Sequence, residues 1–222
     1  MAVGDDFKVS RRYREDIVKL AAQWRAANLA WATANSFDVV RLLQEFVLPT
    51  LLKYGREIVL RIVDDDWELP DGWVDWDNGE VCFQNFVWEQ ALASEPHGRL
   101  VVAHEIGHLL LHRDQSFAFS KGLEKKLNFL EPEESAEQQA NWFASALLVP
   151  DSVLRRLSDL DVYSAATLTL VGEQVIRVRR RQLTLEKHHF TGDQCPRCSS
   201  MSVVQRGVVT ACINCGTELA SC

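Results

Sequence analysis

The sequence predicts an α+β fold, in which several helices accompany a small mixed or antiparallel sheet and a separate metal-bound module follows at the C-terminus. Three observations predict it. Apolar residues recur at intervals of three and four over several long stretches, which is typical of amphipathic helices. Strand signals in the main body are confined to residues 57–84, so its sheet is small. Four of the six cysteines form two Cys-x-x-Cys pairs, a spacing typical of zinc sites.

Length and composition suit one sizeable domain with a small appendage. The formal net charge of −7 argues against a general nucleic-acid coat protein, although a local basic patch is compatible with it. The sequence has no run of about 20 apolar residues, so we expect no membrane-spanning segment. The first ten residues lack the apolar stretch of a secretory signal, so we expect a cytoplasmic protein with reduced cysteines.

The N-terminal part predicts two helices and a strand. The first helix covers residues 12–34, where large apolar residues keep a helical period. Ser36 or Asp38 can cap a second helix over residues 37–53, which Gly55 ends. Residues 57–63 (Glu-Ile-Val-Leu-Arg-Ile-Val) are typical of a strand.

An acidic and aromatic stretch follows. Residues 64–80 hold eight acidic residues, three tryptophans and no Lys or Arg. The pair Asn78-Gly79 is a strong turn signal and predicts a hairpin between residues 73–77 and 80–84. One interpretation is a solvated sheet edge whose tryptophans face the core. The other is an acidic, aromatic rim of a substrate groove that attracts basic partners. The tryptophans are Trp67, Trp73 and Trp76.

The second half is mainly helical. We expect helices over residues 94–114 and 132–148, separated by a loop over residues 115–131. Further helices are expected over residues 152–160 and about 167–185.

Residues 104–108 (His-Glu-Ile-Gly-His) carry the strongest chemical signal of the chain. His104 and His108 differ by only about 40° in direction on a helix of roughly 3.6 residues per turn, so both can bind one Zn²⁺. Glu105 beside them can take a proton from a metal-bound water, which is the arrangement of metallopeptidases.

A catalytic zinc takes three protein ligands, so a third donor is needed. Glu137 lies on the returning helix, which can bring its carboxylate to the histidine pair, and Asn141, one turn further, can hydrogen-bond a histidine ligand. His112, Glu133 and Glu134 are alternative donors. A straight helix cannot easily present three successive turns to one ion, so His112 is better suited to hydrogen bonding or packing. Glu133 and Glu134 are better suited to the first turn of a helix, where acids interact favourably with the helix dipole.

These two motifs resemble those of the ImmA/IrrE family of metallopeptidases. The resemblance runs through residues 99–112 and 137–150 and covers about residues 37–185. It implies a zincin-like peptidase domain. Arg99 matches a family arginine, which is either structural or faces the substrate. The implied zinc ligands are His104, His108 and Glu137, and the implied general base is Glu105.

The expected reaction is zinc-assisted hydrolysis of a peptide bond. Glu105 accepts a proton from the attacking water and passes it to the leaving amine. A Tyr or His usually stabilises the oxyanion in such sites, and Tyr163, His188 and His189 are all available for that role.

Residues 160–185 have the pattern of a helix, a short turn and a second helix, which is similar to a helix-turn-helix. Four arginines on the second helix would suit a DNA-reading helix. Arginine runs are usually solvated, however, and the family resemblance implies a segment that packs on the peptidase core. We therefore expect packing or substrate docking, with direct nucleic-acid binding as the alternative. The arginines are Arg177, Arg179, Arg180 and Arg181.

The C-terminal cysteines predict a zinc ribbon with a second, structural Zn²⁺. Two strand-like stretches lie between the Cys-x-x-Cys pairs, and a segment near 30 residues needs the metal to fold. The four ligands are Cys195, Cys198, Cys212 and Cys215. We expect an N-terminal helical extension, a zincin-like peptidase domain, a helix-turn-helix-like segment and the ribbon over residues 1–36, 37–150, 151–190 and 191–222, respectively.

The resemblance implies a function as well. ImmA/IrrE proteins cleave helix-turn-helix transcriptional repressors, so a zinc endopeptidase acting on such a repressor is the first hypothesis. A non-catalytic binding regulator on the same fold is the second, but it has no need of Glu105. SprT-like DNA-associated proteases also join such a helix to a ribbon. They use a third histidine, however, whereas this chain offers Glu137.

Overall fold

The structure is a computed structural model that describes residues 6–112, 130–186, 189–190, 194–199, 203–206, 209–212 and 217–219. The chain forms two compact units, Met1–Ile176 and Arg177–Cys222. Most of the loop predicted over residues 115–131 lies outside the described residues. Within the described part, no helix is both long and apolar enough to cross a membrane.

The first unit contains a three-stranded sheet and most of the helices. Its strands are β1 (Val59–Val63), β2 (Gly72–Asp75) and β3 (Glu80–Gln84). Its helical elements are α1 (Arg14–Ala27), η1 (Leu29–Trp31), α2 (Val39–Arg41), η2 (Leu42–Val47), α3 (Leu48–Lys53), α4 (Asn85–Leu92), α5 (Pro96–Leu111), η4 (Pro132–Glu134), α6 (Ala136–Leu148), α7 (Asp151–Arg156), α8 (Val162–Thr169) and the first residues of α9 (Glu173–Glu186).

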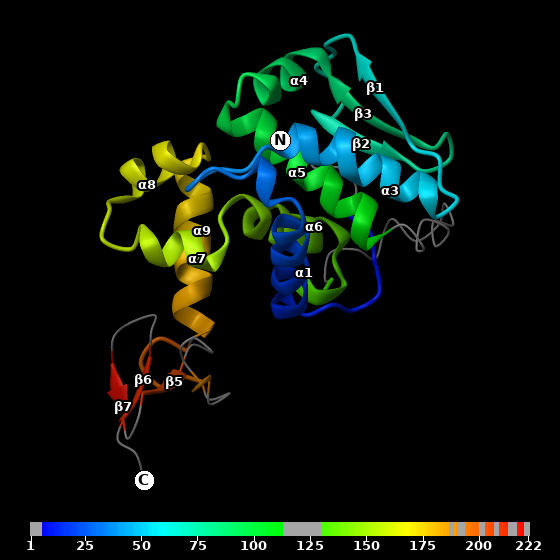
Figure 1. The fold of residues 1–222 in the computed structure, drawn as a ribbon. Coiled ribbons are helices and arrows are strands. Elements are labelled where there is room, and N and C mark those ends of the chain that lie inside the picture. Colours follow the sequence, from blue (N-terminus) through cyan, green and yellow to red (C-terminus); the bar gives the residue numbers. More distant parts are fainter. Residues whose placement is uncertain are drawn as a thin grey trace. The chain divides into compact units, whose positions relative to one another are not determined.

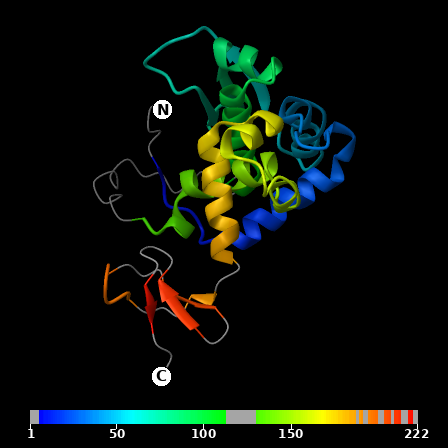
Figure 2. The same ribbon diagram turned by 90° about the vertical axis from the view of Figure 1, so that its left-hand side faces the viewer.

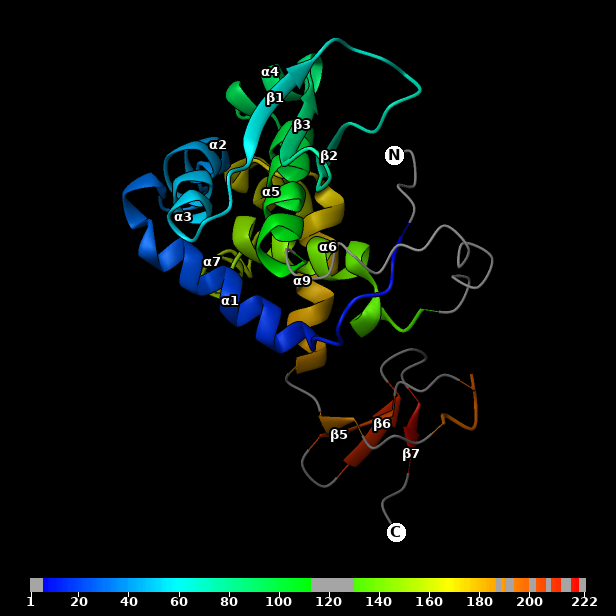
Figure 3. The same ribbon diagram turned by 90° about the vertical axis from the view of Figure 1, so that its right-hand side faces the viewer.

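The sheet is mixed, one of the two arrangements that the sequence left open. Its order is β1-β3-β2, with β3 parallel to β1 and antiparallel to β2. The Asn78-Gly79 turn closes the β2–β3 hairpin, and Gly79 has the positive φ of 67° that glycine tolerates best. The sheet lies at one end of the unit, next to α4 and the beginning of α5 (Figures 1, 2 and 3).

The core of the unit forms around α5, which packs against both α4 and α6. Apolar side chains on several sides of α5 are buried, among them Val102, Ile106 and Leu109. The N-terminal helix α1 packs on α6 and contributes the buried Ile17 and Ala21. The two motif-bearing helices are thus the most enclosed part of the unit, which favours a fixed geometry for their polar side chains.

The helices expected over residues 12–34 and 152–160 are shorter, ending at Ala27 and Arg156, and the one expected over residues 37–53 is divided into α2, η2 and α3. Two further features differ from the sequence expectation. Helix α4 was not predicted, because Asn85 follows β3 directly and no Gly or Pro marks the change from strand to helix. The interpretation that all three tryptophans face the core is wrong for Trp67, whose exposed fraction is 89%. Trp73 and Trp76 are half-buried.

Arg99 is a buried structural residue. It is 3% exposed, and its guanidinium donates hydrogen bonds to the backbone carbonyls of Phe37, Thr169 and Leu170. Burial lowers the pKa of Arg99 to about 10. These contacts tie α5 to the end of α8 and to Phe37, so the Arg99 guanidinium contributes to the packing of the fold.

Replacing Arg99 with Leu is expected to lower the free energy of unfolding by about 2–4 kcal/mol, because three carbonyls lose a charged donor. Denaturant unfolding followed by circular dichroism measures this change. Arg61→Leu is the matched control, since Arg61 forms only an exposed ion pair with Glu80 and should cost no more than about 1 kcal/mol. Equal stability of the two variants would show that Arg99 does not hold these segments together.

Helices α8 and α9 are joined by a three-residue turn. The side chain of Asp161 accepts a hydrogen bond from the backbone N–H of Ser164 and begins α8, and Leu170 ends it with a φ of 54°. The four arginines of α9 do not share one exposed face. Arg179 is fully buried and donates to Gln182 Oε1, Arg180 is half-buried, and Arg177 and Arg181 are exposed.

The second unit contains a four-stranded antiparallel sheet of order β4-β5-β6-β7. Its central hairpin pairs β5 (Val203–Arg206) with β6 (Val209–Cys212), close to the strand-like stretches predicted there. The edge strands are β4 (His189–Phe190) and β7 (Glu218–Leu219). Cys195, Val203 and Cys212 form its buried apolar cluster.

Candidate metal centres

The first candidate centre lies between α5 and α6. The Nε2 atoms of His104 and His108, on consecutive turns of α5, are 2.9 Å apart. Glu137, in the first turn of α6, places its two carboxylate oxygens 3.1 and 3.2 Å from these nitrogens. The three donors lie within 4.8 Å of one another. The structure thus brings together the three residues expected from the sequence to bind one ion.

Helices α5 and α6 lie close enough together for these three side chains to meet. A Cβ atom added at Gly107 would lie 3.1 Å from Ala140 Cα and 3.2 Å from Ala140 O. Because Gly107 has no side chain, α6 can pack directly on the face of α5 that carries the histidines. Ser135 caps α6 by accepting a hydrogen bond from Gln138 N, which fixes where the helix begins and therefore where Glu137 lies.

The donor set fits zinc. Two imidazole nitrogens and one carboxylate are a common ligand combination for catalytic Zn²⁺. The Nδ1 atoms of both histidines point away from the cluster, toward Asn141 Oδ1 at 3.2 Å for His104 and His112 Nδ1 at 3.0 Å for His108. Their Nε2 atoms are therefore the ones available to an ion.

Glu137 is suited to serve as an anionic ligand. Burial acts to raise its pKa, but the hydrogen bonds from His104 and His108 outweigh that effect and lower the pKa below its ordinary value. Its carboxylate is therefore ionised where it faces the histidine pair.

Glu105 is close to the cluster in sequence but is not one of its three donors. It is 5% exposed, and burial raises its pKa, while His108 and His104 act in the opposite direction. A buried carboxylate with a raised pKa is suited to accept and return a proton.

His112 is not a donor to the cluster. It is fully buried, its Nδ1 faces His108 Nδ1, and its Nε2 lies 3.2 Å from Gln139 Oε1. Burial, together with the nearby His108, lowers the pKa of His112 to about 3. The site geometry agrees with the hydrogen-bonding role expected for this residue.

Three residues next to the centre were not singled out from the sequence. Gln139 is a fully buried amide, and the sequence signal that could have found it is a polar residue on the core-facing side of an amphipathic helix. Asp6 and Phe7 come from the N-terminal segment and contact α6 and the histidines. Their proximity depends on long-range packing, for which the sequence carries no local signal.

The expected oxyanion-stabilising residues are not assigned by the structure. Tyr163 is 70% exposed on α8, and His188 lies outside the described residues. For His189 the structure describes the backbone, which is part of β4.

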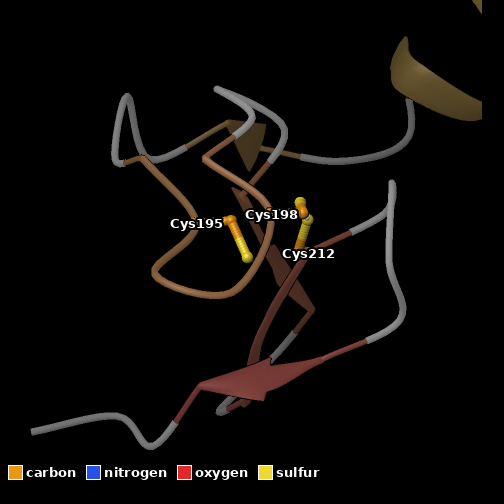
Figure 4. A group of neighbouring side chains, drawn as sticks. All are labelled: Cys195, Cys198 and Cys212. Carbon is orange, nitrogen blue, oxygen red and sulfur yellow. Dashed lines mark hydrogen bonds between the residues drawn. The ribbon is translucent and has the colours of Figure 1, made fainter.

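The second candidate centre lies in the second unit. One ligand atom each from Cys195, Cys198 and Cys212 falls within 4.8 Å of the others, and the Sγ atoms of Cys198 and Cys212 are 3.6 Å apart. Figure 4 shows the three side chains gathered between the Cys195–Cys198 turn and β6. Three clustered thiols fit a thiolate-bound zinc. The fourth predicted ligand, Cys215, lies outside the described residues.

A family model for peptidase M78, the IrrE N-terminal-like domain, matches residues 68–181. The chain belongs to the IrrE N-terminal-like family. The matched region of this IrrE-like chain contains the whole His104–His108–Glu137 cluster, which confirms the resemblance drawn from the two motifs. The N-terminal segment and the cysteine cluster lie outside the matched region.

Comparisons with individual proteins add little to the family assignment. None of the curated proteins matches the IrrE-like chain. Among solved structures, one that it resembles is a Mycobacterium tuberculosis transcriptional regulator, with a TM-score of 0.46 and 15% identity. The match covers 84% of this chain and 49% of that chain, so the IrrE-like chain spans about half of the regulator's length.

Proposed function

We propose that the protein is a zinc-dependent endopeptidase that hydrolyses a peptide bond in a protein substrate. The observation that carries the proposal is the convergence of His104, His108 and Glu137 with the buried Glu105 beside them. The family assignment supports a peptidase-type domain. A domain that only bound a partner would not need a proton acceptor such as Glu105 beside the three candidate ligands.

The chain's own residues define the chemistry. His104, His108 and Glu137 would hold zinc, which supplies Lewis acidity and an acidified water when bound. Asn141 and His112 orient the two imidazoles through their Nδ1 atoms. Glu105 accepts the proton of the attacking water and delivers it to the leaving amine, so the carboxylate returns to its initial state.

For the substrate we propose a helix-turn-helix transcriptional repressor. The support is the family resemblance of the two motifs, since ImmA/IrrE proteins act on such repressors. Glu137 in contact with both histidines supports this assignment over a DNA-associated protease of the SprT type, in which a third histidine takes that place. The arrangement of the α9 arginines, one of them buried, gives no support to a DNA-reading helix.

For the second unit we propose a zinc ribbon with a structural role. Cys195, Cys198 and Cys212 would bind the ion, and Cys215 would complete a tetrahedral set. Among the described residues of this unit the apolar cluster is small and centred on cysteines, so the metal would provide much of its folding free energy.

Metal analysis tests both centres together. We expect two zinc ions per chain in the wild type and about one in Glu137→Ala and in Cys198→Ser, because each variant removes one ligand of a different site. Inductively coupled plasma mass spectrometry of the full-length proteins gives the count. One zinc per chain that Glu137→Ala leaves unchanged would show that the α5–α6 site holds no stable metal, and a binding regulator would then replace the peptidase proposal.

A further inference from the structure

We propose that the N-terminal segment, residues 6–12, positions two of the three metal ligands and is therefore a working part of the metal centre. The proposal rests on the zinc site of the proposed function and adds to it a set of positioning residues. The segment lies outside residues 68–181, the part of the chain that the family model matches.

The segment runs antiparallel to the residues that begin α6. Val9 N donates to Glu134 O at 2.8 Å, Arg12 N donates to Glu133 O at 2.9 Å, and Ala136 N donates to Phe7 O at 3.1 Å. Three backbone hydrogen bonds over so short a stretch fix its register against the start of α6. Glu137 is the residue that immediately follows this paired region.

Asp6 acts directly on the backbone of the ligand Glu137. Its Oδ1 accepts a hydrogen bond from Glu137 N at 3.2 Å, and its Oδ2 accepts one from Ser135 Oγ at 2.6 Å. An aspartate that accepts hydrogen bonds from N–H groups in the first turn of a helix satisfies these donors. Its negative charge also interacts favourably with the helix dipole. Asp6 therefore holds the first turn of α6 in the place from which Glu137 reaches the histidines.

A hydrogen-bond chain leads from the segment to the ligand His108. Gln139 Nε2 donates to the carbonyls of Ser10 at 3.0 Å and Glu133 at 2.7 Å, which turns Gln139 Oε1 toward His112. His112 must then donate from Nε2, so its Nδ1 is an acceptor. That acceptor faces His108 Nδ1 at 3.0 Å, which leaves His108 Nε2 with the lone pair that a metal requires.

Phe7 packs on the same histidines. Its ring is stacked on His108 with centroids 6.2 Å apart and meets His112 edge-on at 5.8 Å. The ring thus limits the movement of both imidazoles. The segment reaches Glu137 through Asp6, and it reaches His108 through Ser10 and through Phe7.

Zinc affinity of the full-length protein, measured by competition with a chromophoric chelator, tests the proposal without any substrate. Asp6→Ala and His112→Leu are each expected to weaken the zinc of the α5–α6 site by about 10- to 100-fold, the usual effect of losing a hydrogen-bond partner of a metal ligand. Arg11→Ala is the matched control. Arg11 belongs to the same segment, but its exposed side chain lies beside Glu134 and Tyr13 and takes part in none of the contacts described above, so its loss should leave zinc affinity unchanged.

His112→Asn separates hydrogen bonding from packing. Its Oδ1 can take the place of the acceptor Nδ1, whereas Leu has no acceptor. We therefore expect His112→Asn to bind zinc more tightly than His112→Leu. Equal affinities in these two variants would overturn the part of the proposal that concerns His108. Asp6→Ala acts on a different ligand, so the proposal stays testable even if His112→Leu does not fold.

His104→Ala distinguishes failure of the metal centre from failure of the positioning role. If it binds as much zinc as the wild type, the metal centre itself is refuted, and the positioning role falls with it. If it loses one zinc while Asp6→Ala and His112→Leu match the wild type in affinity, the metal centre stands and the positioning role of residues 6–12 is refuted.

Discussion

Glu105→Gln is expected to lower the kcat/KM for cleavage of a protein substrate by about 10²- to 10⁴-fold while the protein keeps both zinc ions. The amide has nearly the same shape as the carboxylate but cannot accept the proton of the attacking water. Glu105 is not one of the three clustered donors, so metal binding should not depend on it. This combination of retained metal and lost activity separates a proton-transfer role from a ligand role.

The measurement is proteolysis of a helix-turn-helix repressor, followed by gel electrophoresis and mass spectrometry of the fragments, with zinc content determined on the same preparations. Glu89→Gln is the matched control, because Glu89 is an exposed acid on the neighbouring helix α4 and should leave kcat/KM unchanged. Wild-type rates in zinc-loaded Glu105→Gln would remove Glu105 from the mechanism. Loss of zinc in that variant would instead make it a ligand.

Gly98→Ala is expected to lower the free energy of unfolding by about 3 kcal/mol, an effect comparable to that of Arg99→Leu. A Cβ atom at this position would lie 2.4 Å from Ala91 N and 2.5 Å from Val87 O, both backbone atoms of α4. Backbone atoms cannot move away to relieve a clash as the end of a flexible side chain can, so α4 and α5 would have to separate. Because α5 carries His104 and His108, zinc affinity should fall with stability.

Gly172→Ala is the control for Gly98→Ala. No atom lies within 4 Å of a Cβ added at Gly172, so the methyl group meets nothing and reduces only the freedom of the unfolded chain. We expect the free energy of unfolding to change by less than about 1 kcal/mol, measured in denaturant under the same conditions. If Gly98→Ala proves equally mild, α4 and α5 are less closely packed than the distances of 2.4 and 2.5 Å indicate.

The convergence of His104 and His108 could be predicted from the sequence because their geometry is local. His104 and His108 are four residues apart on one helix, and that spacing alone directs both imidazoles to one side. Glu137 needed the second motif, since its approach depends on how α6 returns to α5. The β2–β3 hairpin followed from the Asn78-Gly79 turn, whereas the parallel pairing of β1 with β3 had no signal in the sequence.

The surroundings of the ligands could not be predicted in the same way. Asp6, Phe7 and Gln139 meet the centre because a segment more than a hundred residues away in sequence pairs with the start of α6. No local period or turn signal encodes such a contact. Arg99 shows the same limit: its motif position was visible, but its burial against Phe37 and Thr169 depends on packing between distant elements.

The contact between Gly107 and Ala140 has a consequence for how the five-residue motif should be searched for in other chains. A pattern written His-Glu-x-x-His treats position 107 as free, yet here the second x faces the backbone of α6, and a Cβ atom there would lie 3.1 Å from Ala140 Cα. A chain with a bulky residue there would satisfy the pattern, but its two helices would lie too far apart to share an ion in this way. The search pattern should therefore require a small residue at the position of Gly107 and another at the position of Ala140. Such a search would discard false matches that the two histidines alone admit.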